Sequence, residues 1–156
     1  MADSETARPS RAMLDTNVFL SATDQGRAEH RQAMLILNDW ASRGTALYAS
    51  GQIVREYLSV ATRPADRNGL GLTQAAALAN IRALRARTSL LAEDVNVADR
   101  LLNVLDEVPC SGKQVHDANV VATMLVHGVE SLITLNVADF SRFEQHIMLI
   151  PLSAAG

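Results

Sequence analysis

Four carboxylates of this chain stand where a sheet of parallel strands would present reactive side chains. Asp15 directly follows a short apolar run, and Asp139 follows the apolar segment SLITL. Glu56 lies on a predicted helix, away from that helix's apolar stripe. Asp117 lies in the first turns of HDANVVATM, a predicted helix that is otherwise apolar. Because open α/β sheets bind ligands at the carboxyl ends of their strands, these four residues are candidates for an active site.

Each of these carboxylates also has a purely structural interpretation. Asp15 and Asp139 could be helix caps, and Glu56 could lie on a solvated helix face, since glutamate is rarely buried. Asp117 fits such an interpretation less well, because a charge among apolar neighbours needs a partner or a cation. His116 is interpreted as a solvated or hydrogen-bonded histidine and is not assigned as a ligand.

Taken together, the four carboxylates indicate a metal site. Carboxylates that converge cannot all ionise without a compensating cation, because like charges raise each other's pKa values. Sites rich in oxygen suit hard cations, chiefly Mg²⁺ or Mn²⁺, and no clustered Cys or His ligands suggest structural zinc. Such a site is typical of metal-assisted phosphodiester hydrolysis.

Composition bounds the class of protein. The chain has 156 residues, 48% of them hydrophobic and 20% charged, which predicts one domain with a substantial core. Its formal net charge of −3 excludes a whole-protein field that attracts nucleic acid, so RNA binding would need local basic groups or bound cations. The single cysteine, Cys110, excludes a disulfide within the chain and favours a reducing compartment.

The first ten residues, MADSETARPS, are polar and lack the apolar stretch of a secretory signal. No apolar run approaches the roughly 20 residues that span a bilayer, so we expect no membrane contact and a cytoplasmic protein. We expect a flexible tail over 1–10, a single domain over 11–151 and a short tail over 152–156.

Short apolar segments alternate with helical patterns along the chain. Strands are predicted over 12–14, 46–49, 89–91, 131–135 and 147–150. Helices are predicted from Val18, over 27–43, from a cap at Ser50 to Pro64, and over 73–87, 95–105 and 114–127, with one turn over 139–143. This alternation favours an α/β fold whose mainly parallel sheet is covered on both faces.

The blocks LDTNVFL, SGQIVREYL, HDANVVATM and LITLNVADF resemble those of PIN-domain nucleases, and among them the VapC-type toxins of bacterial toxin–antitoxin pairs. The resemblance extends over about 11–151. It implies a three-layer α/β/α sandwich with a central, mainly parallel sheet. It also implies an endoribonuclease that depends on Mg²⁺ or Mn²⁺.

The resemblance also implies roles for individual residues. Asp15, Glu56 and Asp117 match the first three acidic positions of the family and would hold the metal. At the fourth position Asn136 cannot carry the charge, so Asp139 is assigned as the fourth carboxylate. Four polar side chains are expected to orient the carboxylates or the substrate phosphate: Thr16, Asn17, Thr134 and Asn136.

The resemblance further implies partners, namely an RNA substrate, a second copy of the chain, and a small antitoxin whose tail blocks the acidic groove. Four basic residues beside the motif blocks are candidate RNA contacts: Arg55, Arg63, Arg67 and Lys113. For each of them taken singly, an ordinary solvated charge is the favoured interpretation.

Two other functions stay open at this point. A phosphatase or phosphotransfer domain could use Asp15 as nucleophile with Lys113 as the phosphate-binding lysine. A PIN-like module could instead bind RNA or protein without cutting, although four intact carboxylates argue against it. Trapping of a phosphoryl group on Asp15 would favour the first alternative, and RNA binding without metal-dependent turnover would favour the second.

Overall fold

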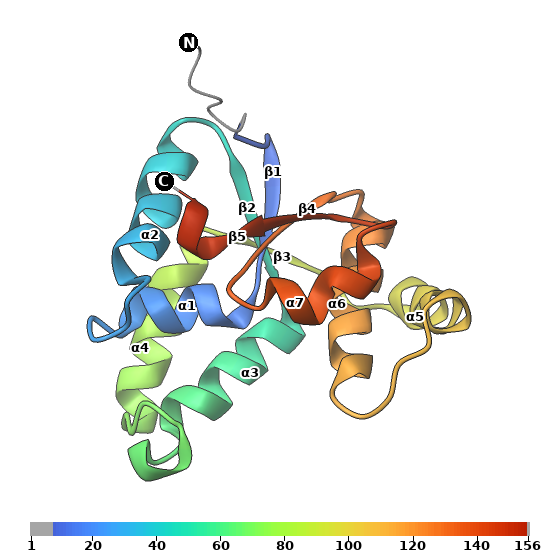
Figure 1. Ribbon diagram of the computed structural model, residues 1–156. Coiled ribbons are helices and arrows are strands. Elements are labelled where there is room, and N and C mark those ends of the chain that lie inside the picture. The colour runs from blue at the N-terminus through green and yellow to red at the C-terminus, as the bar shows by residue number, and fades with distance from the viewer. Residues whose placement is uncertain (1–7, 156) are drawn as a thin grey trace.

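The computed structural model describes residues 8–155 and is built around a five-stranded sheet (Figure 1). In spatial order the strands are β3 (Ser89–Leu91), β2 (Ala46–Ser50), β1 (Arg11–Leu14), β4 (Ser131–Thr134) and β5 (Met148–Pro151). Every neighbouring pair is parallel. The expected α/β fold with a central parallel sheet is confirmed.

Helices cover both faces of the sheet. On one side lie α1 (Thr16–Thr23), α2 (His30–Leu35), α3 (Gly51–Thr62) and α4 (Gln74–Arg85). On the other side α5 (Val95–Glu107) packs against α6 (Gln114–His127), as Figure 1 shows. The short α7 (Val137–Phe140) follows β4, and the remaining turns are η1 (Ile36–Trp40), η2 (Ala65–Arg67), η3 (Ser141–Phe143) and η4 (Leu152–Ala154).

The apolar character of β1 follows from its central place in the sheet. Ala12, Met13 and Leu14 are fully buried, and β1 pairs with β2 on one side and with β4 on the other. A strand covered on both faces is apolar throughout instead of alternating with polar residues. The first polar residue after it, Asp15, therefore stands where the strand leaves the core.

Several predicted helix ends are confirmed. Ser50 and Thr73 cap α3 and α4, and their hydroxyls accept from the backbone N–H of Ile53 and Ala76. Gly128 ends α6 with a φ of +67°, a left-handed conformation that glycine adopts without strain.

The segment expected as one helix over 27–43 differs from that prediction. Here α2 begins only at His30, and the chain then widens into the π-helical turn η1. Ile36, Leu37 and Trp40 of η1 are all buried, so core packing accompanies this departure from regular helix geometry. Pro151, which was expected to stop the last strand, is instead its final residue, as an edge strand tolerates proline.

Residues near the termini are engaged by the domain. The part of the expected N-terminal tail over 1–7 lies outside the described residues, but the carbonyl of Pro9 accepts from the Thr45 hydroxyl. Residues 152–155 were expected to be a tail, yet Leu152 is fully buried and η4 contacts α2. No helix over 8–155 combines the length and apolarity needed to cross a bilayer.

Candidate active site

The candidate site lies at the carboxyl edge of the sheet, beside β1. The strand order 3-2-1-4-5 reverses direction at β1, which makes the end of this strand a topological switch point. Asp15 occupies that point as the N-cap of α1 and is only 7% exposed. Its backbone N–H donates to the carbonyl of Ile133 in β4, which ties the strand end in place.

Asp15 is held by three hydrogen bonds. Its Oδ1 accepts from the backbone N–H of Thr16 at 2.8 Å. Its Oδ2 accepts from the Thr134 hydroxyl at 2.7 Å and from Asn17 Nδ2 at 3.3 Å. Burial raises the pKa of the Asp15 carboxyl, while the bonds from Thr134 and Thr16 oppose that rise. The hydrogen bonds thus fix the orientation of the carboxylate, but they do not fully offset the cost of burying its charge.

Asn17 and Thr134 connect Asp15 to the end of β4. Asn17 Oδ1 accepts from the backbone N–H of Leu135 at 3.0 Å, and Thr134 Oγ1 accepts from the N–H of Asn136 at 3.0 Å. The side chain of Asn136 itself is exposed and makes no cap bond to α7. Asn17 and Thr134 therefore reach Asp15 as expected of carboxylate-orienting residues, whereas Asn136 contributes through its backbone.

Glu56 faces the same edge from α3. Its Oε2 accepts from the Thr16 hydroxyl at 2.7 Å, and its Oε1 accepts from Gln52 Nε2 at 2.8 Å. The residue is half-buried. The solvated helix face that was one interpretation of Glu56 is not what the structure shows, because both of its oxygens are bonded within the protein.

Asp117 and Asp139 complete the group. Asp117, half-buried in the first turn of α6, has its pKa raised to about 6, first by burial and then by the charges of Asp15, Asp139 and Glu56. Asp139 is exposed in the first turn of α7. Within residues 8–155 neither carboxylate forms an ion pair or accepts a side-chain hydrogen bond. The charges of Asp15, Glu56 and Asp139 all act on Asp117, so the four acidic side chains share one electrostatic neighbourhood.

Three polar residues that the sequence analysis did not select also belong to this edge. Gln52, Glu93 and Asn119 bond to one another, and Gln52 bonds to Glu56. Glu93 comes two residues after β3, a position comparable to that of Asp15 after β1. That placement was the one signal in the sequence from which Glu93 could have been selected.

The basic residues near the site are all exposed. Arg55 lies on α3 beside Glu56, and Lys113 directly precedes α6. Arg63 directly follows α3, and Arg67 ends η2. A further cation, Arg142 of η3, was not selected from the sequence, and its charge lowers the pKa of Asp117 against the larger effects that raise it.

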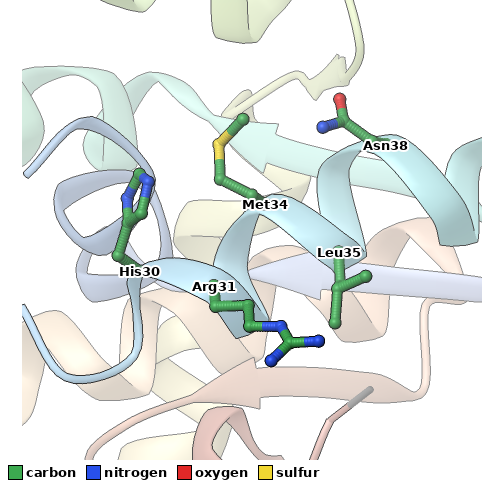
Figure 2. Close-up of a pocket in the computed structure, with 5 residues that line it drawn as sticks. All are labelled: His30, Arg31, Met34, Leu35 and Asn38. Carbon is green, nitrogen blue, oxygen red and sulfur yellow. The ribbon is translucent and has the colours of Figure 1, made fainter. Parts of the chain in front are cut away.

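A hollow of about 300 Å³ lies elsewhere on the surface and is formed by α2 and η1. Figure 2 shows its lining residues: His30, Arg31, Met34, Leu35 and Asn38. None of them is a candidate site residue. This hollow is therefore separate from the candidate site, which is defined by the charge and position of the carboxylates.

The donor atoms at the carboxyl edge suit a hard divalent cation in charge and in chemistry. They are carboxylate and hydroxyl oxygens, and no Lys or Arg over 8–155 forms an ion pair with any of the four carboxylates. Within the same residues no three Asp, Glu, His or Cys side chains are grouped so that they could hold an ion by themselves. Mg²⁺ commonly keeps several waters and takes only one or two carboxylates, so it does not need three of these side chains to be grouped together.

Removal of the Thr134 hydroxyl is expected to destabilise the fold. Thr134→Val leaves Asp15 Oδ2 with only the longer bond from Asn17 and leaves the N–H of Asn136 without its partner, at a cost of about 1–3 kcal/mol in the free energy of unfolding. Urea denaturation measures that loss. The matched control is Thr62→Val, because the exposed Thr62 hydroxyl donates only within its own helix. Equal losses for the two variants would contradict a special role for Thr134.

Comparison with solved structures shows that the fold is shared with toxin–antitoxin proteins. A chain of VapBC2 from Rickettsia felis, bound to a DNA fragment of its promoter, superposes with a TM-score of 0.68 at 12% identity, covering 90% of this chain and 98% of that one. DNA-bound VapBC from Salmonella typhimurium gives 0.67 at 19% identity, covering 91% and 98%. Mycobacterium tuberculosis VapC20, described as a toxin that cleaves the sarcin–ricin loop, gives 0.63 at 17%, covering 83% and 93%.

Sequence comparisons give the family. No curated protein sequence matches the chain. The family model described as PIN domain matches residues 12–145, a span that includes all four carboxylates of the candidate site. This match covers most of the chain and agrees with the strand order and with the solved structures, so the chain belongs to the PIN domain family.

Proposed function

We propose that this protein is a metal-dependent endoribonuclease and the toxin of a VapBC-like toxin–antitoxin pair. The observation that carries the proposal is the shared neighbourhood of Asp15, Glu56, Asp117 and Asp139, in which burial and then the charges of the other three carboxylates raise the pKa of Asp117. Such a group favours a divalent cation over the empty state, because a cation relieves the repulsion. The same cation would also offset the repulsion between the acidic side chains and the phosphates of a polyanionic substrate.

In such a site the carboxylates would bind the metal, and the neighbouring polar side chains would orient the carboxylates. One or two of the carboxylates of Asp15, Glu56, Asp117 and Asp139 would hold Mg²⁺ or Mn²⁺ directly, and the others would hold it through its bound water. When bound, the ion activates water and stabilises the leaving oxygen of a phosphodiester. Thr16, Asn17 and Thr134 keep the carboxylates of Asp15 and Glu56 in fixed orientations through the bonds described above.

The proposed partners are an RNA substrate, a cognate antitoxin and a second copy of this chain, all in the cytoplasm. The antitoxin is supported by the structural neighbours, which come from VapBC complexes of Rickettsia felis and Salmonella typhimurium. We infer that the antitoxin inserts a basic tail into the acidic edge, since the carboxylates of Asp117 and Asp139 form no ion pair with any described residue over 8–155. Light scattering of the purified chain tests the homodimer.

Cleavage of total cellular RNA tests the activity. The purified chain, free of antitoxin, is incubated with Mg²⁺, with Mn²⁺ and with a chelator, beside Asp117→Asn, and the new RNA ends are sequenced. Discrete cuts that need metal and disappear in the variant are the expected result. RNA binding by the folded protein without any cut would favour the binding module instead, and a phosphoryl group trapped on Asp15 would favour the phosphotransfer domain.

Neutralising the arginines beyond α3 is expected to weaken RNA binding without changing metal affinity. The double variant Arg63→Ala/Arg67→Ala removes two exposed charges that do not contact the carboxylates. For every phosphate that an arginine no longer neutralises, the slope of log K against log salt should decrease by about 0.7 on single-stranded RNA. Binding to inactive Asp117→Asn protein at several salt concentrations measures this slope. An unchanged slope would show that these two arginines are ordinary solvated charges.

A further inference from the structure

Gln52 is a buried amide at the start of α3 whose polar atoms are all used. It is 5% exposed. Its Nε2 donates to Glu56 Oε1 at 2.8 Å and to the backbone carbonyl of His116 in α6 at 3.0 Å. Its Oε1 accepts from Asn119 Nδ2 at 2.7 Å. Gln52 therefore connects a carboxylate of the candidate site to the helix that carries Asp117.

The orientation of the Gln52 amide follows from the chemistry of its neighbours. An ionised carboxylate and a backbone carbonyl can only accept, so the NH₂ end must face Glu56 and His116. Asn119 Nδ2 uses its second hydrogen on Glu93 Oε1 at 2.8 Å, another acceptor. Turning either amide by 180° would place two acceptors in contact. Each amide therefore has one satisfactory arrangement.

Glu93 closes the network. While its Oε1 accepts from Asn119, its Oε2 accepts from the backbone N–H of Gln52 at 2.7 Å. That N–H belongs to the first turn of α3, where backbone donors lack helical partners. These bonds thus join three segments next to Glu56: the loop after β3, the start of α3 and the first half of α6.

We propose that Gln52, held by Asn119 and Glu93, is a positioning residue that fixes the carboxylate of Glu56 for the metal-dependent reaction. The inference rests on the proposed nuclease function. Glu56 receives one bond on each oxygen, from Thr16 and from Gln52, so the plane of its carboxylate is set from two directions. Each oxygen keeps a further lone pair for a cation or a water. Without Gln52 one of these two constraints is absent.

The test is a double-mutant cycle between Gln52→Met and Glu56→Gln, read as the Mn²⁺ affinity of the antitoxin-free chain without RNA. Methionine keeps the size of glutamine and removes both ends of the amide. Losing an outer partner of a metal ligand typically costs 10–100-fold, so we expect Gln52→Met to weaken Mn²⁺ binding about 10-fold. In the Glu56→Gln background the same change should have almost no effect, because Gln52 acts through Glu56.

RNA cleavage supplies the second readout. We expect Gln52→Met to lower kcat about 10-fold with little change in KM, since Gln52 makes no contact that would bind RNA directly. The matched control is Tyr57→Phe, which removes a bonded hydroxyl from the adjacent part of the same helix, on the side of Thr23 and Asn80. It should lose stability without losing Mn²⁺ affinity or kcat. If Gln52→Met does not fold, Asn119→Ala removes the bond that holds Gln52 Oε1, so Gln52 is then held through Nε2 alone, and Mn²⁺ affinity and kcat should fall in the same direction by a smaller factor.

The outcomes separate this inference from the proposed function. A wild-type chain that binds Mn²⁺ and cuts RNA, beside a Gln52→Met variant that does both equally well, would overturn the positioning role alone. Additive losses in the double variant would also overturn it, because they indicate a general structural role. A wild-type chain that neither binds Mn²⁺ nor cuts RNA would overturn the proposed function, and this inference with it.

Discussion

Asp15→Asn is expected to reduce metal-dependent RNA cleavage at least ~100-fold while the protein stays folded. Loss of an outer partner of a metal ligand already costs 10–100-fold, so loss of the central carboxylate should cost at least the upper end of that range. The change is nearly isosteric, and asparagine can still accept from the backbone N–H of Thr16 as the cap of α1. The measurement is kcat/KM on a defined RNA, with circular dichroism to verify folding.

The stability of Asp15→Asn should change little, because two effects oppose each other. Removing the charge removes the cost of burying it, the same cost that raises the pKa of Asp15. Against this, the new NH₂ group faces the Thr134 hydroxyl and Asn17 Nδ2, which both donate to the carboxylate now. The mismatched hydrogen bonds cost about 1–3 kcal/mol and the relieved burial of the charge offsets part of that cost, so the melting temperature should move by only a few degrees.

The matched control for this loss of activity is Asp99→Asn. Asp99 is an exposed carboxylate of α5, so its neutralisation changes the net charge equally but should leave cleavage unchanged. An active Asp15→Asn protein would refute the role assigned to Asp15. Inactivity of both variants would point to the net charge of the protein and not to the site.

Much of this site was predictable because each strand end has a local signature in the sequence. A buried parallel strand is an apolar run, and the first polar residues after it stand at the carboxyl edge, as Asp15 does after β1. Asp117 was identifiable because a charge is unusual in an otherwise apolar helix. These signals involve only a few neighbouring residues, which patterns of hydrophobicity describe well.

The bonding partners of Glu56 were not predictable in this way. Asn119 and Gln52 are 67 residues apart, and Gln52 and Glu93 are 41 apart. Periodicity assigns these residues to elements but does not say that α3, α6 and the loop after β3 meet at one point. The π-helical turn η1 was missed for a similar reason. An amphipathic pattern predicts a helix but does not distinguish a regular α-helix from a short π-helical turn, which depends on packing in the core.

The free energy of unfolding of the metal-free protein should fall through Asp117 as the pH rises from 4 to 6, and Asp117→Asn should remove that contribution. The folded-state pKa of Asp117 is about 6, above its ordinary value of 3.8. Between these values the folded protein holds a proton that the unfolded chain has released, so acid favours folding. Two pKa units correspond to about 3 kcal/mol, and partial exposure reduces this to roughly 1–2 kcal/mol.

Other carboxylates of the chain titrate over the same range, so the informative quantity is the difference between Asp117→Asn and the wild type. Urea denaturation at several pH values should show no advantage of the variant near pH 3.5 and its full advantage above about pH 6.5. Asp99→Asn again serves as the control, because its carboxylate is exposed on α5. A constant difference at every pH would contradict the raised pKa of Asp117.

Addition of a divalent cation at pH 7.5 should reverse the order of stability. A ligand that binds only the folded state at ten times its Kd adds about 1.4 kcal/mol, and the wild type should gain this while Asp117→Asn gains little. The variant is then more stable without metal and the wild type equally or more stable with it. The burial and repulsion that raise the pKa of Asp117 explain the first result by themselves, whereas a metal site is needed to explain both. A variant that keeps its advantage at saturating Mn²⁺ would therefore argue that these carboxylates are close together without serving as a cation site.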